Sequence, residues 1–303
     1  MVNVCVLGTQ GGMPMVGKFM SAVIINYGGR KILIDCGEGT QIAMRKYNCG
    51  FKTLDYILIS HSHGDHTIGI SGLLGTMGNS GRLEPVTIIG PKGISEIVKG
   101  LMVINKHLPY EIRVIEAGND SFDIYEGVTV NTLEVEHSTE CIAFSLNFKR
   151  RPKFSLESAE KNNVPKKLWS LLQKGKEIEY EGKTYTPDLV LGEERRGIKL
   201  SYLTDTRPLE KITEFIRDSE LFICEGNYGN DDDIDKAIKN KHMTFREAAT
   251  LAKSGNCKAM IITHFSPSME NPSIYEKNAK EVFENSVIGY DGIERVLTYE
   301  EEN

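Results

Sequence analysis

The chain has 303 residues, of which 40% are hydrophobic and 26% are charged, and its formal net charge is −6. This composition is typical of a globular protein with a full hydrophobic core, and it argues against a disordered or low-complexity chain. No window reaches the roughly 18 consecutive apolar residues of a membrane span, and no basic and then apolar leader precedes the first strand-like run. We therefore expect no membrane partner and a cytoplasmic location.

Short runs rich in Val, Ile and Leu, bounded by Gly or polar residues, predict strands along the whole chain. The strands are expected at residues 2–7, 22–26, 31–35, 56–60, 86–90, 111–115, 128–136, 142–148, 198–204, 221–224, 259–263 and 293–297. The stretches between them predict helices at residues 40–47, 67–77, 94–105, 209–217, 244–253 and 274–283. Mixed elements in two comparable halves favour two packed sheets with helices outside, although a single doubly wound sheet has the same alternation.

The segment 150–194 interrupts this pattern with three prolines, a charged stretch and one short hairpin-like piece at 177–185. Between Lys149 and Lys199 there are 13 Lys or Arg against 8 Asp or Glu, whereas the rest of the chain has 23 against 34. Such an irregular length inside a compact domain is usually functional or a linker. We expect either a basic arm that binds a polyanion or merely a solvated excursion.

The six cysteines have no CxxC pair or regular spacing, so neither a disulfide framework nor a thiolate zinc site is indicated. We expect buried, reduced thiols.

A dense cluster of histidines follows the strand expected at 56–60. The run His61-Ser-His63-Gly-Asp65-His66 holds three of the seven histidines of the chain. Two histidines at alternate positions can face one point while the adjacent Asp and His face a second, which predicts two neighbouring ion sites. A single histidine at a strand end would usually be structural, but this cluster is unlikely to arise without a metal.

One loop supplies too few ligands for two ions, so further His or Asp residues are required at other strand ends. His137, Asp205 and His264 each follow an expected strand. Taken singly, each would be an ordinary surface or capping residue. Together with the cluster they predict a binuclear centre.

Several motifs resemble the metallo-β-lactamase superfamily and, within it, the ribonuclease Z family of tRNA 3′-endonucleases. The resemblance covers nearly the whole chain. It is carried by Leu7-Gly-Thr, Asp35-Cys-Gly-Glu-Gly-Thr-Gln, the histidine motif, His137-Ser-Thr, Ala143-Phe followed by Arg151-Pro-Lys-Phe, Val190-Leu-Gly, Thr204-Asp-Thr-Arg, Glu225-Gly-Asn-Tyr, His242-Met-Thr-Phe-Arg-Glu-Ala-Ala and Thr263-His-Phe-Ser. The histidine motif identifies the superfamily alone, and the elements that begin at Asp35 and His242 are more specific.

The resemblance implies an α/β fold, a four-layer αββα sandwich of one domain over 1–303 with a protruding arm at 150–194. It implies one ion on His61, His63 and His137, the other on Asp65, His66 and His264, and Asp205 between them. Zinc suits these ligands first, and manganese or iron would be tolerated. Two cations would activate a water molecule and stabilise charge on the attacked phosphoryl group.

Further roles follow for residues around the ions. Asp65 would also orient or deprotonate the water, and Asp35 would support the histidine loop. His242 would be the general acid for the leaving ribose oxygen, oriented by Glu225. Thr244 and Glu247 fit a capping box and are expected to be structural.

The implied substrate is a precursor tRNA, cut beyond the discriminator base to leave a 3′-hydroxyl, and the family implies a homodimer. The candidate tRNA contacts are Lys18, Arg150, Arg151, Lys153, Lys166 and Lys167. The chain departs from the family in the loop around Pro14 and Lys18, at the arm tip around Asn163, and after His264. These departures leave a small-molecule phosphodiesterase as the alternative, with the arm as a lid or dimer contact. A non-catalytic metal-stabilised scaffold would give His242 and Glu225 no role.

Overall fold

The computed structural model describes residues 1–300 of the chain, and these form two compact units. Unit 1 comprises residues 1–147 and 199–298, and unit 2 comprises residues 148–198 together with 299 and 300. Within the described residues, no helix is both long and apolar enough to cross a membrane.

Unit 1 contains a first seven-stranded sheet in the order β16-β1-β2-β3-β4-β5-β6. Its strands are β1 (Val2–Gly8), β2 (Ala22–Tyr27), β3 (Arg30–Ile34), β4 (Leu54–Leu58), β5 (Val86–Gly90), β6 (Ile112–Glu116) and β16 (Ile293–Leu297). Pairing is antiparallel from β16 to β3 and parallel from β3 to β6. The carboxyl ends of β3 and β4 therefore meet at one edge of this sheet.

The second seven-stranded sheet has the order β15-β14-β13-β12-β9-β8-β7. Its strands are β7 (Ser121–Tyr125), β8 (Val128–Val135), β9 (Cys141–Arg150), β12 (Arg195–Leu203), β13 (Leu221–Glu225), β14 (Met260–Thr263) and β15 (Ser286–Ile288). The strands β12, β13, β14 and β15 pair in parallel. β9 and β12 continue along the chain into unit 2.

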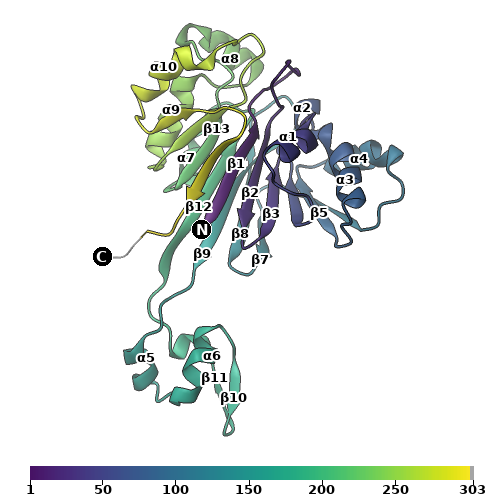
Figure 1. Ribbon diagram of the computed structural model, residues 1–303. Coiled ribbons are helices and arrows are strands. Elements are labelled where there is room, and N and C mark those ends of the chain that lie inside the picture. The colour runs from purple at the N-terminus through teal and green to yellow at the C-terminus, as the bar shows by residue number, and fades with distance from the viewer. Residues whose placement is uncertain (301–303) are drawn as a thin grey trace. The chain divides into compact units, whose positions relative to one another are not determined.

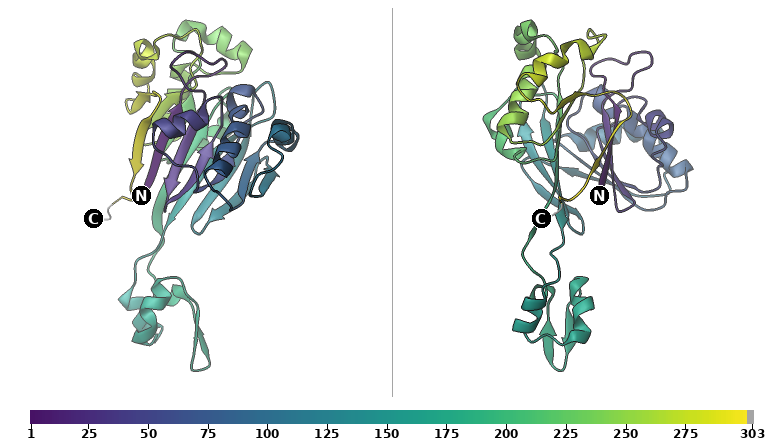
Figure 2. Two further views of the ribbon diagram at one scale, coloured as in Figure 1. Left: turned by 45° about the vertical axis from the view of Figure 1, so that its right-hand side comes forward. Right: turned by 60° about the vertical axis from the view of Figure 1, so that its left-hand side comes forward.

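Helices cover the outer faces of both sheets (Figure 1, Figure 2). α1 (Thr40–Lys46), α3 (Gly69–Asn79) and α4 (Ile94–Leu101) share one apolar cluster with the first sheet. α7 (Glu210–Phe215), α9 (Phe245–Ser254) and α10 (Glu276–Lys280) share a second cluster with β12, β13 and β14. The expected αββα sandwich is therefore confirmed, and the single doubly wound sheet is wrong.

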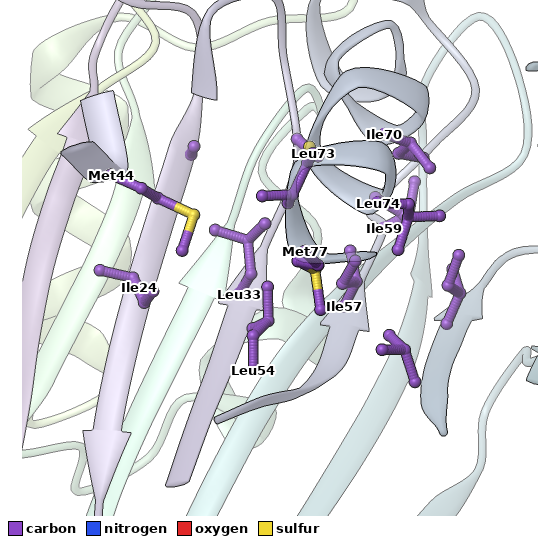
Figure 3. Packing of buried hydrophobic residues seen from close by; sticks show 14 of the residues in the cluster. Ile24, Leu33, Met44, Leu54, Ile57, Ile59, Ile70, Leu73, Leu74 and Met77 are labelled. Atoms are coloured by element: carbon purple, nitrogen blue, oxygen red, sulfur yellow. The ribbon is translucent and has the colours of Figure 1, made fainter. Parts of the chain in front are cut away.

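Strand periodicity explains why both faces of the first sheet are apolar. Successive side chains of a strand point to opposite faces. In β1, Cys5 and Leu7 belong to the helix-covered cluster, whereas Val4 and Val6 alternate with them and are equally buried. Figure 3 shows the covered face, where Met44 of α1 and Leu73 and Met77 of α3 pack over the strands. This burial on both faces fixes the register that positions the strand ends.

Unit 2 has its own small apolar core. It contains α5 (Leu156–Lys161), α6 (Trp169–Gln173) and the hairpin β10 (Ile178–Tyr180) and β11 (Lys183–Tyr185). The buried core residues are Ala159, Val164, Leu168, Leu172 and Val190. The interpretation of 150–194 as irregular was therefore wrong except for the hairpin, because apolar residues scattered among many charges still converge when short helices form.

Most expected elements occur within a few residues of their predicted bounds, and the exceptions have local causes. The helix expected at 67–77 is divided into α2 (Gly64–Thr67) and α3, and the helix expected at 274–283 is shortened to α10 after a 3-10 turn. The sequence analysis missed β7, β15 and α8 (Ile234–Asn240). Within the described residues all six cysteines are free, and Cys49 alone is only partly buried.

Candidate active site

The histidine motif and its expected partners follow the carboxyl ends of strands in both sheets. His61 follows β4, Asp205 follows β12 and His264 follows β14. Carboxyl ends of parallel strands meet at one edge of a sheet, which is where α/β folds hold their sites. An isolated bridge between His61 and Cys141 links the two sheets at this edge.

The structure brings all seven expected ligands together in two groups, and Asp205 of the first group also forms a third group with His264 and His242. The first group is His61, His63, His137 and Asp205, and the second is Asp65, His66 and His264. Within each group the donor atoms lie within 4.8 Å of one another.

In the first group three ring nitrogens converge. Nε2 of His61 lies 3.0 Å from Nδ1 of His63, and Nε2 of His137 lies 3.3 Å from the same Nδ1. The alternate spacing of His61 and His63 thus turns both rings to one point. Nε2 of His63 points away, 3.4 Å from the hydroxyl of Ser138.

In the second group a carboxylate and two ring nitrogens converge. Nε2 of His66 lies 3.1 Å from Nε2 of His264. Oδ2 of Asp65 lies 3.3 Å from each of these nitrogens and accepts the backbone N–H of Gly12 at 2.7 Å.

Asp205 faces both groups with different oxygens. Its Oδ2 lies 3.4 Å from Nε2 of His61, and its Oδ1 lies 3.1 Å from Nε2 of His264. A carboxylate in this position can contribute one oxygen to each of two ions.

The donor set fits divalent cations. Neutral imidazole nitrogens that face one another at about 3 Å carry lone pairs and repel unless a proton or a cation lies between them. Here His61 and His66 are fully buried, with an exposed fraction of 0%, so water cannot relieve that repulsion. Three nitrogens with one carboxylate, and two nitrogens with two carboxylates when Asp205 is shared, match His/Asp zinc-type sites.

Asp35 supports the histidine loop from beneath. Its Oδ2 lies 2.8 Å from Nδ1 of His66, and it accepts the Ser60 backbone N–H at 2.8 Å and the Tyr202 hydroxyl at 2.7 Å. The bond to Nδ1 leaves Nε2 of His66 free to face the second group. This is the usual way in which a partner fixes the orientation of a metal-binding histidine.

Other ring nitrogens are held by partners that the sequence analysis missed. Nδ1 of His137 lies 3.3 Å from the carbonyl of Lys241, Nδ1 of His61 lies 3.0 Å from the Ser60 hydroxyl, and the Asn227 amide lies 3.2 Å from Nδ1 of His264. Asn227 belongs to the motif that begins at Glu225, so this motif could have indicated that Asn227 lies at the site. The carbonyl of Lys241 gave no signal, because a backbone atom carries no residue preference.

A close approach of backbone to ring requires glycine at position 11. A Cβ at Gly11 would lie 2.5 Å from the His264 ring. Any other residue would displace that ring, although Gly11 carries no chemistry of its own.

Three non-glycine site residues adopt the left-handed region. φ is 57° at Asp35, 42° at Asp205 and 58° at His264. Such conformations cost of order 1–3 kcal/mol each and cluster at functional sites. Each of these residues follows a strand directly or by one residue, so the turn aims its side chain back across the strand ends.

His242 lies beside the two groups and is oriented by Glu225. Its Nδ1 is 3.2 Å from both carboxylate oxygens of Glu225, which is fully buried and also accepts the backbone N–H groups of Thr206 at 2.7 Å and Met243 at 3.1 Å. Burial lowers the pKa of His242, but the charge and hydrogen bond of Glu225 outweigh this effect and raise the pKa to about 9. Nε2 is the ring nitrogen left for a substrate.

The carboxylates and His61 respond differently to burial. Burial raises the pKa of Asp65 and of Asp205, but the histidines around each carboxylate lower it by more, so both pKa values lie far below the usual range. Burial and the neighbouring charge of His66 lower the pKa of His61. The carboxylates are therefore ionised and His61 is neutral, which are the forms that bind cations. Burial lowers the pKa of His66, but the charges of Asp35 and Asp205 raise it by more, so His66 must release a proton when a cation binds.

A pocket of about 500 Å³ opens over both groups. Its lining includes His63, Asp65, Asp205, His242 and His264, together with Tyr228 and Lys241. The pocket is large enough for a nucleotide-sized group and brings it against both the ligand cluster and His242.

The remaining expected residues lie in two places. Lys18 is exposed in the loop of unit 1 after Gly11. In unit 2, Arg150 donates to the carbonyl of Glu300 at 2.6 Å, while the ammonium groups of Lys166 and Lys167 lie over the rings of Trp169 and Tyr180. Arg151 and Lys153 are exposed in the same unit. The capping box of Thr244 and Glu247 is present at the start of α9.

The chain is similar to known proteins over nearly its whole length. The chain is 58% identical to a ribonuclease Z of Clostridium botulinum (strain Eklund 17B / Type B), over 99% of this chain and 99% of that sequence. It is 52% identical to a ribonuclease Z of Clostridioides difficile (strain 630), over 99% of this chain and 100% of that one. A family model described as anti-Pycsar protein Apyc1 matches residues 2–178, within this longer region of similarity.

Solved structures share the fold at low sequence identity. The human short-form tRNase Z has a TM-score of 0.69 at 23% identity, covering 98% of this chain and 99% of that one. The metallo-β-lactamase fold protein YhfI of Bacillus subtilis has a TM-score of 0.72 at 19% identity, covering 98% of this chain and 100% of that one. With full-length relatives above 50% identity and this fold, the chain belongs to the ribonuclease Z family of metallo-β-lactamase fold proteins.

Proposed function

We propose that the protein is a metal-dependent endoribonuclease that removes the 3′ trailer of precursor tRNA and leaves a 3′-hydroxyl. The observation that carries this proposal is the pairing of His242 with Glu225 beside the ligand cluster, in one pocket. A bare metal site suits many hydrolases, but a protonated imidazole beside it suits a reaction whose leaving group needs a proton. Membership of the ribonuclease Z family supports the choice of substrate.

Two zinc ions would be held by the seven ligands, His61, His63, Asp65, His66, His137, Asp205 and His264, with manganese or iron as substitutes. They would lower the pKa of a water molecule and neutralise charge on the phosphate. Asp65 would orient that water. Asp65 would also accept the proton that this water releases.

The reaction requires one bond to form and one to break. A water oxygen bonds to phosphorus, and the bond from phosphorus to the ribose 3′ oxygen breaks with its electron pair on that oxygen. His242 would give its Nε2 proton to this oxygen, and the trailer would leave with a 5′-phosphate. The Glu225 carboxylate favours the protonated imidazole before the transfer, and solvent restores the proton afterwards.

Unit 2 would bind the body of the tRNA. Its segment 149–199 has an excess of Lys and Arg on an otherwise acidic chain, and phosphate contacts require such a local cluster rather than a basic total. Arg150, Arg151, Lys153, Lys166 and Lys167 would contribute, and Lys18 would contact the same RNA from unit 1. Folded RNA would be recognised by shape more than by sequence. We also propose a homodimer in the cytoplasm, as the family resemblance implies.

The test uses the zinc-loaded protein and a precursor tRNA with a 3′ trailer. We expect cleavage after the discriminator base, and a loss of about 10²–10⁴-fold in His242→Ala, which is the usual contribution of a positioned acid. The matched control is His107→Ala, since His107 is exposed and distant in sequence from every site motif. An intact precursor beside hydrolysis of bis(4-nitrophenyl) phosphate would support the alternative, a small-molecule phosphodiesterase. Unchanged cleavage of the precursor by His242→Ala would contradict the proposed role of His242.

A further inference from the structure

Arg207 lies two residues after Asp205 and has no role in the proposed reaction so far. It ends the motif Thr204-Asp-Thr-Arg. Its side chain is 15% exposed, and the carboxylate that it pairs with, Glu247, is 20% exposed. An ion pair this protected from water holds its geometry better than a surface pair does.

The guanidinium of Arg207 connects two elements. One nitrogen, Nη1, donates to the backbone carbonyl of His242 and lies 3.1 Å from Oε2 of Glu247. The other, Nη2, donates to Oε1 of Glu247. The planar fork thus pairs with both oxygens of one carboxylate while it holds the carbonyl of His242, which a lysine ammonium cannot do with the same geometry.

Glu247 is itself fixed to the segment that carries His242. It accepts the backbone N–H of Thr244 at 2.9 Å, and its own N–H donates to the Thr244 hydroxyl at 3.2 Å. These bonds form the capping box at the start of α9. The segment from His242 to Thr244 is therefore held at its beginning by Arg207 and at its end by the helix cap.

The same turn also holds the partner of the imidazole. Thr206, next to Arg207, donates its backbone N–H to Oε1 of Glu225 at 2.7 Å, and its hydroxyl accepts the N–H of Glu136 at 3.0 Å. Glu225 in turn contacts Nδ1 of His242. Three consecutive residues, Asp205 to Arg207, thus contact the ligand cluster, the carboxylate behind His242 and the backbone of His242.

We propose that Arg207 is a positioning residue, which sets the distance of the His242 imidazole from the phosphate bound at the ligand cluster. This inference rests on the proposed function, because it assigns His242 a proton transfer. The competing explanation is that Arg207 merely stabilises the start of α9. The two differ in which reactions need Arg207: a displaced acid slows only reactions whose leaving group needs a proton, whereas a loosened fold slows every reaction.

The experiment compares Arg207→Lys with Arg246→Lys. Arg246 is the matched control, since it also lies near the start of α9 and pairs with two carboxylates, Asp231 at 2.7 Å and Glu281 at 2.9 Å, but contacts no site residue in the described structure. Each zinc-loaded variant is assayed with precursor tRNA and with bis(4-nitrophenyl) phosphate, whose leaving group departs as a stable anion. Metal content and thermal unfolding are measured alongside.

We expect kcat for the precursor to fall by about tenfold to a hundredfold in Arg207→Lys, as for a misplaced catalytic group, with KM and metal content unchanged. Turnover of the activated phosphodiester should stay at the wild-type rate in both variants, and Arg246→Lys should keep both activities. If Arg207→Lys unfolds below the assay temperature, Glu247→Gln takes its place, since it releases one side of the same clamp and should give a smaller loss with the same selectivity.

Equal losses on both substrates, or no loss on either, would overturn the role of Arg207 while the proposed function stands. A wild-type protein that cleaves the activated phosphodiester but no precursor would overturn the proposed function, and this inference with it. The activity of the wild-type protein on the precursor therefore tells whether the proposed function fails or only the role of Arg207.

Discussion

The two units of the chain hold their side chains in different ways. In unit 1 the functional residues are buried at strand ends, and nearly every ring nitrogen and carboxylate oxygen of the site has a partner within 3.4 Å. In unit 2 a small core of five buried residues is surrounded by partly buried hydrophobic residues, and the cations lie on its surface against aromatic rings and a backbone carbonyl. Unit 1 thus holds its site residues at fixed positions, whereas unit 2 presents its cations at the surface, as the proposed contact with tRNA requires.

The largest expected effect comes from removing the carboxylate shared by both ligand groups. Asp205→Ala should abolish turnover of both precursor tRNA and bis(4-nitrophenyl) phosphate and reduce the bound metal measured by mass spectrometry. The physical reason is that each group would lose a ligand at once. Unchanged metal content would show that Asp205 is not a shared ligand. Asp232→Ala, at an exposed position outside both groups, is the control.

A smaller effect is expected from Glu225→Gln, which changes the pH dependence of the general acid His242 and leaves the metal ligands in place. In Glu225→Gln the imidazole of His242 loses the charge that raises its pKa to about 9. An acid acts only when protonated, so precursor cleavage falls as pH rises through its pKa, and the variant should show this fall at lower pH than wild type. The measurement is the pH profile of kcat for precursor tRNA. A fall at the same pH in both proteins would contradict the role of Glu225.

Removal of unit 2 should affect binding and leave the chemistry intact. Replacing residues 152–193 by a short Gly-Ser linker should raise KM for precursor tRNA and weaken its salt dependence, because fewer phosphates are neutralised. Hydrolysis of bis(4-nitrophenyl) phosphate should continue at the wild-type rate. Loss of both activities would show that unit 2 is needed for the fold or the site of unit 1.

The smallest effect tests the core of unit 2 by itself. Leu172 is fully buried there, so Leu172→Ala should destabilise that unit by about 2–5 kcal/mol. Because the core is small, we expect an early unfolding transition and a higher KM for the tRNA, with unit 1 unfolding at its usual temperature. Leu73→Ala is the control, since Leu73 lies in the core of unit 1 and should lower the main transition instead. A single shared transition in both variants would contradict the separation of the units.

Most of the helices and strands, and the residues that converge at the candidate site, could be predicted from the sequence. Periodic apolar runs predict strands because burial on one or both faces imposes the pattern, and His and Asp directly after strands predict convergence because parallel strands end at one edge. The spacing of His61 and His63 already indicated that both rings face one point. The capping box at Thr244 and Glu247 was also predicted, because its hydrogen bonds join residues only three positions apart.

Features that depend on residues distant in the chain could not be predicted from the sequence. The folded core of segment 150–194 was missed because its apolar residues are sparse and become a core only after the helices pack. The support from the carbonyl of Lys241 and the space left by Gly11 are backbone properties, which no side-chain pattern encodes. Arg207 stands 35 residues from His242 and 40 from Glu247 along the chain, so its clamp on both exists only once the strands and α9 have met.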